Sequence, residues 1–295
     1  MNFTKYKWLY FFLSALVLIP GIYSLLVWGL KPSIDFTGGS LLELQISNDK
    51  LQIEITNSKL KEIIEEGEVA VSSVQSSGEN TYLFRMKPID KNKSQEIQKI
   101  LSEKFGEIEE LRFETVGPTL GKELIIKTTI AIILAAGFIL FYVATRFGEA
   151  KYGVCAILAM FHDSLILLGI FSLLGHFKKV EIDTLFVTAV LTTLSFSVHD
   201  TVVIYDQIRE SSRRFSKAPF IDLANQAIEK TLVRSLNNSM TIIFVLFSLW
   251  LLGGETVKWF VFALLSGTVA GTYSSTFIAV PLLVVWENSL RRFKR

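Results

Sequence analysis

The segment SVHDTVVIYDQIRE, residues 197–210, places a carboxylate, Asp200, near the end of a long apolar run. Charged side chains are rare inside membrane-spanning helices, because a charge at mid-helix costs about 3 kcal/mol even on lenient scales. Asp206 marks the end of the apolar run, so on a helix Asp200 lies about 9 Å deeper in the membrane. An acid at that depth indicates a functional site.

The whole chain has the composition of a membrane protein. Half of its 295 residues are hydrophobic, and its mean hydropathy is +0.42. A net charge of +2 gives no support for a nucleic-acid partner. The single cysteine, Cys155, excludes an intramolecular disulfide and a cysteine-based metal site, and its apolar surroundings favour a simple packing role.

Six apolar stretches are long enough to cross a bilayer, which requires about 20 residues. We expect spans at residues 8–30, 124–145, 152–174, 184–206, 232–252 and 259–286. The first is too long for a signal-peptide core, so residues 1–30 are predicted to form a retained anchor. Segment 124–286 holds the other five spans. Within it, the basic, amphipathic stretch 207–230 is typical of an interfacial helix, and a basic tail follows at 287–295.

Lysine and arginine in the short loops predict the orientation in the membrane. One side carries Lys5, Lys7, Arg146, Lys151, the six basic residues from Arg209 to Arg234, and the four from Arg291 to Arg295. The short loops of the other side carry Lys178, Lys179 and Lys258. By the positive-inside rule, both termini are cytoplasmic and residues 31–123 lie outside.

Residues 31–123 form a polar segment with 12 basic and 17 acidic residues. Alternating apolar side chains predict strands at 41–47, 69–75, 81–86 and 108–116. Helical spacing predicts one helix around Leu60–Ile64 and another over Ile97–Phe105, which Gly106 ends. The order βαββαβ is the ferredoxin-like arrangement. We therefore expect a bundle of six transmembrane helices plus a small extracytoplasmic α+β domain, which either contacts an outside partner or is a structural cap.

Asp200 belongs to a polar stripe on the fourth span. Its members recur at helical spacing and are Thr193, Ser197, Asp200 and Thr201. Such a stripe is expected to face the bundle interior or a wet cavity rather than lipid. Helix–helix hydrogen bonds are enough to explain the hydroxyls, whereas the charge favours a function.

Arg234 opens the fifth span and is the expected partner of Asp200. It belongs to a second stripe, made of Thr231, Arg234, Asn238 and Thr241. Arg234 could instead snorkel to the interface, but the continuation of the stripe deeper into the span favours the pair. Burial opposes ionisation of a carboxylate and a nearby guanidinium favours it, so Asp200 could take up and release a proton.

Asp163 is a second acid within the spans and follows His162 near the middle of the third. Two interpretations stay open: a buried hydrogen-bonded pair, or a second station of a proton relay. His199, beside Asp200, is expected to be a hydrogen-bonding neighbour, because no second set of ligands completes a metal site.

Motifs of the common enzyme classes are absent from the sequence. There is no Walker loop, G-x-S-x-G, H-E-x-x-H or dinucleotide fingerprint. DFTGGS, residues 35–40, has no preceding strand and predicts a tight turn rather than a phosphate loop. Gly267 and Gly271, with Ser274 and Ser275 one turn later, predict close packing within the bundle. We expect no bond-making chemistry, no cofactor and no metal.

Four motifs together resemble the SecF family, and the resemblance covers nearly the whole chain. They are SIDFTGGS (33–40), VGPTLGKEL (116–124), HDTVVIYDQIRE (199–210) and GTYSSTFIAVPLL (271–283). The lead into Asp200 departs from the family pattern, because His199 stands there. The resemblance implies an RND-type architecture in the cytoplasmic (inner) membrane, and a pseudo-symmetric partner, SecD.

The same resemblance implies a function. SecF proteins act with SecD beside the SecYEG translocon and use the proton-motive force to help pull unfolded preproteins across the membrane. Asp200 and Arg234 match the family positions implicated in proton movement, so protons would be the coupling ion. Two alternatives remain: half of an RND-type exporter for lipids or small molecules, which calls for a larger outer domain, and a scaffold that only assembles the translocon.

Overall fold

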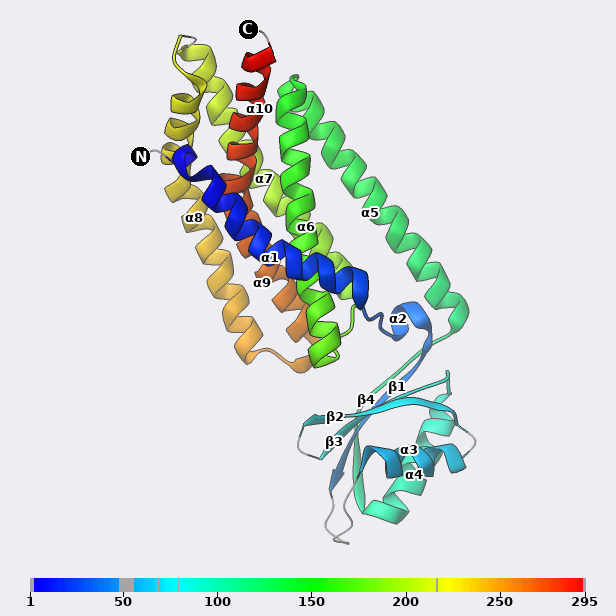
Figure 1. Ribbon diagram of the computed structural model, residues 1–295. Coiled ribbons are helices and arrows are strands. Elements are labelled where there is room, and N and C mark those ends of the chain that lie inside the picture. Colours follow the sequence, from blue (N-terminus) through cyan, green and yellow to red (C-terminus); the bar gives the residue numbers. More distant parts are fainter. Residues whose placement is uncertain (1–2, 48–55, 68, 79, 216, 294–295) are drawn as a thin grey trace. The chain divides into compact units, whose positions relative to one another are not determined.

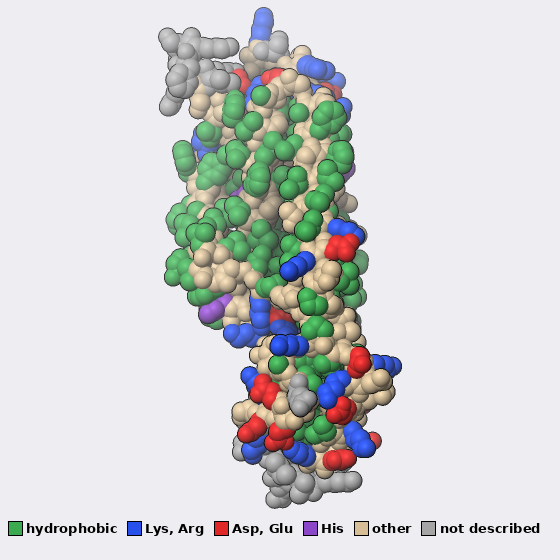
Figure 2. Space-filling view, turned by 90° about the vertical axis from the view of Figure 1, so that its right-hand side faces the viewer, with side chains coloured by type: hydrophobic (Ala, Val, Ile, Leu, Met, Phe, Trp, Pro, Cys, Tyr) green, Lys and Arg blue, Asp and Glu red, His purple; other side chains and the backbone are tan. Residues whose placement is uncertain are grey.

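The computed structural model describes residues 3–47, 56–67, 69–78, 80–215 and 217–293, which fall into two compact units (Figure 1). One unit consists of helices and comprises residues 1–31 and 130–295. The other comprises residues 32–129 and contains the sheet. Figure 2 shows that hydrophobic side chains dominate the surface along the helices, whereas acidic and basic side chains crowd the smaller unit.

The smaller unit is an antiparallel sheet with two helices. Its main elements are β1 (Gly39–Ser47), α3 (Asn57–Glu66), β2 (Val71–Gly78), β3 (Thr81–Met86), α4 (Lys91–Phe105) and β4 (Glu107–Val116). The strand order is β2-β3-β1-β4, and every neighbouring pair is antiparallel. The four strands and two helices predicted from the sequence are confirmed, in the predicted order.

The second strand is displaced from its prediction. Residues 69–75 were expected, but β2 begins at Val71 and continues to Gly78. Pairing with β3 continues through Ser76, which lies opposite Tyr82, so backbone hydrogen bonds extend the strand past its apolar residues. The connection at 76–80 is therefore shorter than expected, and residue 79 lies outside the described residues.

Strand β1 supplies one side of this unit's core. Leu42, Leu44 and Ile46 are fully buried, as expected for alternate residues on one face of a strand. They pack in one cluster with apolar residues of the two helices, among them Leu60, Ile64, Ile97, Leu101 and Phe105. Burial of this helical stripe against the sheet is what fixes α3 and α4.

Two glycines lead the chain into β1. A one-turn helix, α2 (Ile34–Thr37), follows Ser33, whose hydroxyl accepts a hydrogen bond from Asp35 N. Gly38 and Gly39 then adopt φ values of +71° and +132°, which favour glycine. A Cβ on Gly39 would also lie 3.0 Å from the carbonyl oxygen of Met86. The predicted tight turn is thus a short helix followed by a glycine pair.

Among the described residues, six helical segments are long and apolar enough to cross a membrane. The elements are η1 (Phe3–Tyr6), α1 (Lys7–Val27), α5 (Pro118–Phe147), α6 (Ala150–Lys178), α7 (Thr184–Arg214), α8 (Phe220–Leu252), α9 (Glu255–Ser274), the π-helical η2 (Ser275–Ala279) and α10 (Val280–Phe293). Helix α5 begins in the smaller unit. The six predicted spans are confirmed, and the last one continues from α9 through η2 into α10.

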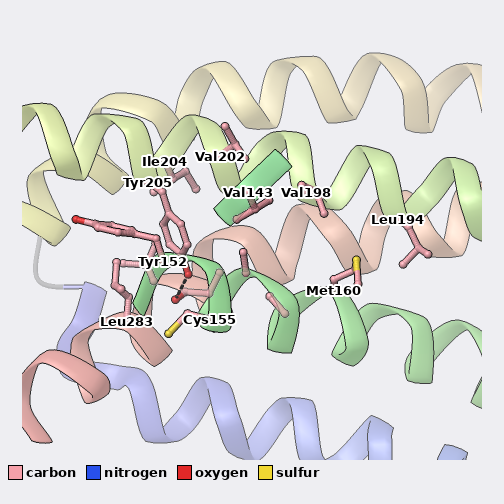
Figure 3. Packing of buried hydrophobic residues seen from close by; sticks show 14 of the residues in the cluster. Val143, Tyr152, Cys155, Met160, Leu194, Val198, Val202, Ile204, Tyr205 and Leu283 are labelled. Atoms are coloured by element: carbon pink, nitrogen blue, oxygen red, sulfur yellow. Dashed lines mark hydrogen bonds between the residues drawn. The ribbon is translucent and has the colours of Figure 1, made fainter. Parts of the chain in front are cut away.

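Helices α6, α7 and α9–α10 form the centre of this unit. Most of their apolar windows are buried, compared with 0% for α5 and 6% for α8. Tyr152, Cys155, Tyr205 and Leu283 pack together here, and the hydroxyl of Tyr205 donates to the carbonyl oxygen of Ala279 in η2 at 2.8 Å (Figure 3). Cys155 has the buried packing role expected of it.

The prediction of one separate helix over 207–230 is wrong. Residues up to Arg214 continue α7, and residues from Phe220 onward begin α8. The break between the two lies before Pro219, whose ring disfavours a helical conformation in the preceding residue. The basic tail at 287–295 is helical as far as Phe293, and residues 294 and 295 lie outside the described residues.

Glycine permits the close approach of α7 and α9. A Cβ on Gly267 would overlap the side chain of Thr193, and one on Gly271 would lie 3.1 Å from Cβ of Ser197. The predicted small-residue packing is therefore confirmed as packing within the bundle.

We expect Gly267→Ala to lower the free energy of unfolding by about 1–3 kcal/mol, because the added methyl group overpacks the α7–α9 contact. Gly137→Ala on α5 is the matched control, since its Cβ would have no described atom within 4 Å. Modification of the buried Cys155 by a thiol-reactive dye during heating reports unfolding. Equal melting temperatures for the two variants would contradict the assignment.

Candidate functional site

Asp163 on α6 accepts hydrogen bonds that arrive from three helices. Its Oδ2 accepts from the hydroxyl of Ser197 on α7 at 2.5 Å and from the hydroxyl of Ser274 on α9 at 2.6 Å. Its Oδ1 lies 2.8 Å from Nδ1 of His162 on the same helix. The side chain is 5% exposed. These three contacts satisfy the carboxyl group in the apolar interior.

His162 connects this cluster to the first helix. Because Oδ1 of Asp163 accepts, Nδ1 of His162 carries the hydrogen in their bond. The other ring nitrogen, Nε2, forms a hydrogen bond with the hydroxyl of Ser14 on α1. We call Ser14, His162, Asp163, Ser197 and Ser274 the Asp163 cluster. It joins α1, α6, α7 and α9 in the interior of the helical unit.

Helices α1 and α6 meet along a seam that keeps one register. The hydrogen bonds from Ser14 to His162 and from Ser24 to Ser172 both span 148 residues. Gly21 and Gly169 share that offset, and a Cβ on Gly21 would lie only 3.1 Å from Cα of Gly169. Further along, the rings of Trp28 and His176 stack with centroids 3.8 Å apart. This repeated spacing of small residues positions Ser14 against the imidazole.

Helix α7 carries the second acid three residues after Ser197. Asp200 is 5% exposed, and its Oδ2 accepts a hydrogen bond from the hydroxyl of Ser235 on α8 at 2.7 Å. Thr193, Ser197 and Thr201 are also buried. The prediction that this stripe faces the interior is therefore confirmed. One turn of α7 separates the residue that contacts Asp163 from Asp200 itself.

Arg234 does not form an ion pair with Asp200 within the described part of the chain. The residue of α8 that contacts the acid is Ser235, and Arg234 precedes it, turned by about 100° around the helix. Arg234 is exposed in the single chain, as are Asn238 and Thr241 of its expected stripe.

The buried stripe of α8 differs from the predicted one. Thr231, Ser235 and Ser239 recur every four residues and are all buried. Ser239 accepts a hydrogen bond from the hydroxyl of Thr272 on α9 at 2.8 Å. The four-residue spacing of these small hydroxyl residues is the pattern in the sequence that indicates the buried face. The predicted stripe instead followed the charge of Arg234, which lies on the neighbouring face. Ser14 and Ser274 carry no comparable pattern.

Exposed polar side chains form a face on the α7–α8 pair. On α7 they are Thr188, Thr192, Ser195 and His199, and on α8 they are Arg234, Asn238 and Thr241. Asp200 and Ser235 face each other, and the two helices run antiparallel (Figure 1). The residue before each, turned by about 100°, therefore points to the same side of the pair. We call this set the α7–α8 polar face.

A groove of about 370 Å³ borders the α7–α8 polar face. Phe138 and Tyr142 of α5 line it together with Ser195 and His199 of α7. Both aromatic side chains are largely exposed. The polar face is thus flanked by an apolar wall that nothing in the described chain covers.

Comparison with known proteins places these features in a family. Residues 96–289 match the model described as protein export membrane protein SecD/SecF, C-terminal. Residues 23–50, which include the glycine pair, match the SecD/SecF GG motif. The chain is 41% identical over its whole length to the protein translocase subunit SecF of Thermobaculum terrenum, covering 97% of that protein. The chain belongs to the SecF family.

As a member of the SecF family, the chain is a multi-pass membrane protein with a role in protein export. It is also 33% identical to the protein translocase subunit SecDF of Thermus thermophilus, over 88% of this chain and 35% of that protein. The crystal structure of the Thermus thermophilus SecDF superposes with a TM-score of 0.84 at 29% identity, covering 98% of this chain and 39% of that one. The SecF-like chain thus corresponds to a little over a third of a SecDF protein.

Ser274→Ala should lower the free energy of unfolding by about 1–3 kcal/mol, because it removes one of the donors to a buried carboxylate. Ser164→Ala is the matched control on α6, since its hydroxyl donates to the carbonyl oxygen of Met160 in its own helix and should matter little. Both are measured by the heat-dependent labelling of Cys155. Equal stability of the two variants would show that Ser274 does not support Asp163.

Proposed function

We propose that the chain is the SecF subunit of a complex with SecD that uses the proton-motive force to assist protein translocation. Unfolded preproteins emerging from SecYEG would be its substrate, and it would make and break no covalent bonds. Asp200 carries the proposal, because it is a buried acid within a membrane span, next to a face that carries a guanidinium. The SecDF names of two relatives support the partnership with SecD.

The proposal includes an orientation and a location. Both ends of the chain would be cytoplasmic, residues 31–123 would lie outside, and the membrane would be the cytoplasmic (inner) one. In the helical unit, the start of α1, the α7–α8 connection and the end of α10 lie at the same end (Figure 1). That arrangement supports the orientation, since the lysine and arginine residues concentrate in these segments.

We also assign the smaller unit to the ferredoxin-like fold and the chain to the RND-type architecture. The element order and the strand order β2-β3-β1-β4 support the first assignment, because they are those of the split βαβ arrangement. The second rests on the family resemblance alone.

The three proposed relay residues would have different roles. Asp163 would stay ionised, because donors from α6, α7 and α9 surround it. Asp200 would exchange the proton, because the described residues offer it the hydroxyl of Ser235 alone. Arg234 would be the fixed cation that favours release of the proton. One proton crossing 100 mV supplies about 2.3 kcal/mol, enough to bias a two-state movement.

The α7–α8 polar face would be covered by SecD. The hydroxyls of Thr188, Thr192 and Thr241 donate hydrogen bonds to backbone carbonyl oxygens of their own helices. The side chains of Arg234 and Asn238 make no hydrogen bond or ion pair among the described residues. A guanidinium left against lipid is costly, so a polar helix of the partner is the fitting neighbour.

Asp200→Asn should abolish the stimulation of export by the proton-motive force and leave the complex with SecD assembled, because the amide cannot take up a proton. Glu210→Gln is the matched control: it changes an exposed acid on the same helix, which pairs with Arg214. Export into membrane vesicles with and without a proton gradient is the measurement. Normal gradient-dependent export from the Asp200 variant would contradict the proposal.

A cysteine at Ser195 should cross-link to a cysteine on the SecD partner, in a chain whose Cys155 is replaced by alanine. Ile133→Cys on α5 is the control, because Ile133 is exposed and lies off the α7–α8 polar face. Oxidative cross-linking followed by gel electrophoresis measures the contact. Cross-linking at Ile133 but not at Ser195 would place SecD on another surface.

A further inference from the structure

We propose that His162 and Asp163 form a second proton-binding site, distinct from Asp200, in which Nε2 of His162 takes up the proton. The use of that proton in export rests on the proposed function. The binding itself does not, because it follows from the hydrogen bonds of the Asp163 cluster.

Within the pair, Nε2 of His162 is the favoured proton acceptor. Both oxygens of Asp163 already accept, from His162, Ser197 and Ser274. Protonating Oδ2 would cost the donation of Ser197 or Ser274, and a carboxylate oxygen is a weaker base than an imidazole nitrogen. Nε2 of His162 instead faces the hydroxyl of Ser14, and a hydroxyl can either donate or accept. When Nε2 gains a proton, the hydroxyl of Ser14 only has to turn its hydrogen away.

The charge balance favours this step. With a neutral imidazole, the pair carries the full negative charge of Asp163 in the interior, where His162 is 8% and Asp163 5% exposed. Binding one proton at Nε2 makes the pair neutral overall, as an imidazolium and a carboxylate with their nitrogen and oxygen 2.8 Å apart. A buried ion pair is less costly than a buried single charge.

The titratable groups on the surrounding helices do not supply a cation that could neutralise Asp163. Near the cluster they are Tyr10 on α1, His199 and Asp200 on α7, and Tyr273 on α9. The hydroxyl of Tyr273 donates to the carbonyl oxygen of Tyr10, and Asp200 binds Ser235.

Farther along α6, Lys151 pairs with Glu287 of α10, and η2 has no titratable residue. Among the described residues, no lysine or arginine makes a hydrogen bond or ion pair with His162 or Asp163. The proton is therefore the cation available to neutralise Asp163.

The position of the pair connects protonation to packing. Ser274 is the last residue of α9 before η2, and Tyr205 holds the other end of η2 at Ala279. Short π-helical turns frequently occur at functional sites. A proton on His162 would weaken the hydrogen bonds that Asp163 accepts from Ser197 and Ser274. The contact between α6 and the start of η2 would weaken with them.

Nitrogen-15 NMR of histidine in the full chain, in lipid bilayers, tests the proposal. The chain has three histidines, so the double variant His176→Gln/His199→Gln leaves His162 as the single imidazole. Spectra recorded from about pH 9 to pH 5, which covers the range where histidine changes charge, should change from the Nδ1–H tautomer to a doubly protonated ring. A ring that stays neutral throughout, or that carries its hydrogen on Nε2 at high pH, would overturn the proposal.

A second variant separates proton binding from folding. Adding Asp163→Asn should eliminate the doubly protonated form over the same range, because the neutralising carboxylate is gone. Ser14→Ala should preserve it, since the Asp163 contact remains. If Asp163→Asn does not fold, the pH dependence of His162 in the histidine double variant still decides whether the site binds a proton.

The outcome is independent of the export assay. If His162 titrates and Asp200→Asn exports normally, the proposed function fails and this site stands. If His162 stays neutral and Asp200→Asn blocks export, the site fails and the proposed function stands.

Discussion

The helical unit depends on satisfying a carboxylate in the middle of an apolar bundle. Asp163 cannot be left without donors in such a medium, since an unpaired buried charge is strongly destabilising. Its donors come from His162, Ser197 and Ser274, so α6, α7 and α9 must approach closely. Gly267 and Gly271 permit that approach, and Ser14 ties α1 to the same point through the imidazole.

The spans of the single chain differ in the fraction of each helix that is buried. The windows of α5 and α8 are 0% and 6% buried, whereas those of α6 and α7 are each 56% buried. Lipid can cover the apolar side chains of α5, but it is a poor solvent for Arg234 and Asn238 on α8. The α7–α8 polar face is therefore the surface on which we propose that SecD binds.

Much of the fold was predictable from sequence because it rests on local patterns. Apolar length gave the six spans, and alternation gave β1 through Leu42, Leu44 and Ile46. Asp200 was predictable as a buried acid from its stripe, but its contact was not. A turn of about 100° separates Ser235 from Arg234, and only packing decides which one meets the acid. Nor could one sequence pair Ser14 with His162, because nothing local records the α1–α6 register.

We propose that the two buried acids have different roles: Asp163 stays ionised, and Asp200 takes up the proton. Infrared difference spectra of the SecDF-type complex in lipid, recorded between neutral and acid pH, test it most directly through the carbonyl band of a protonated carboxyl group. The account predicts one component of this band that disappears in Asp200→Asn, and a band that Asp163→Asn leaves unchanged. A band that Asp200→Asn leaves unchanged, or that loses a component in Asp163→Asn, would contradict it.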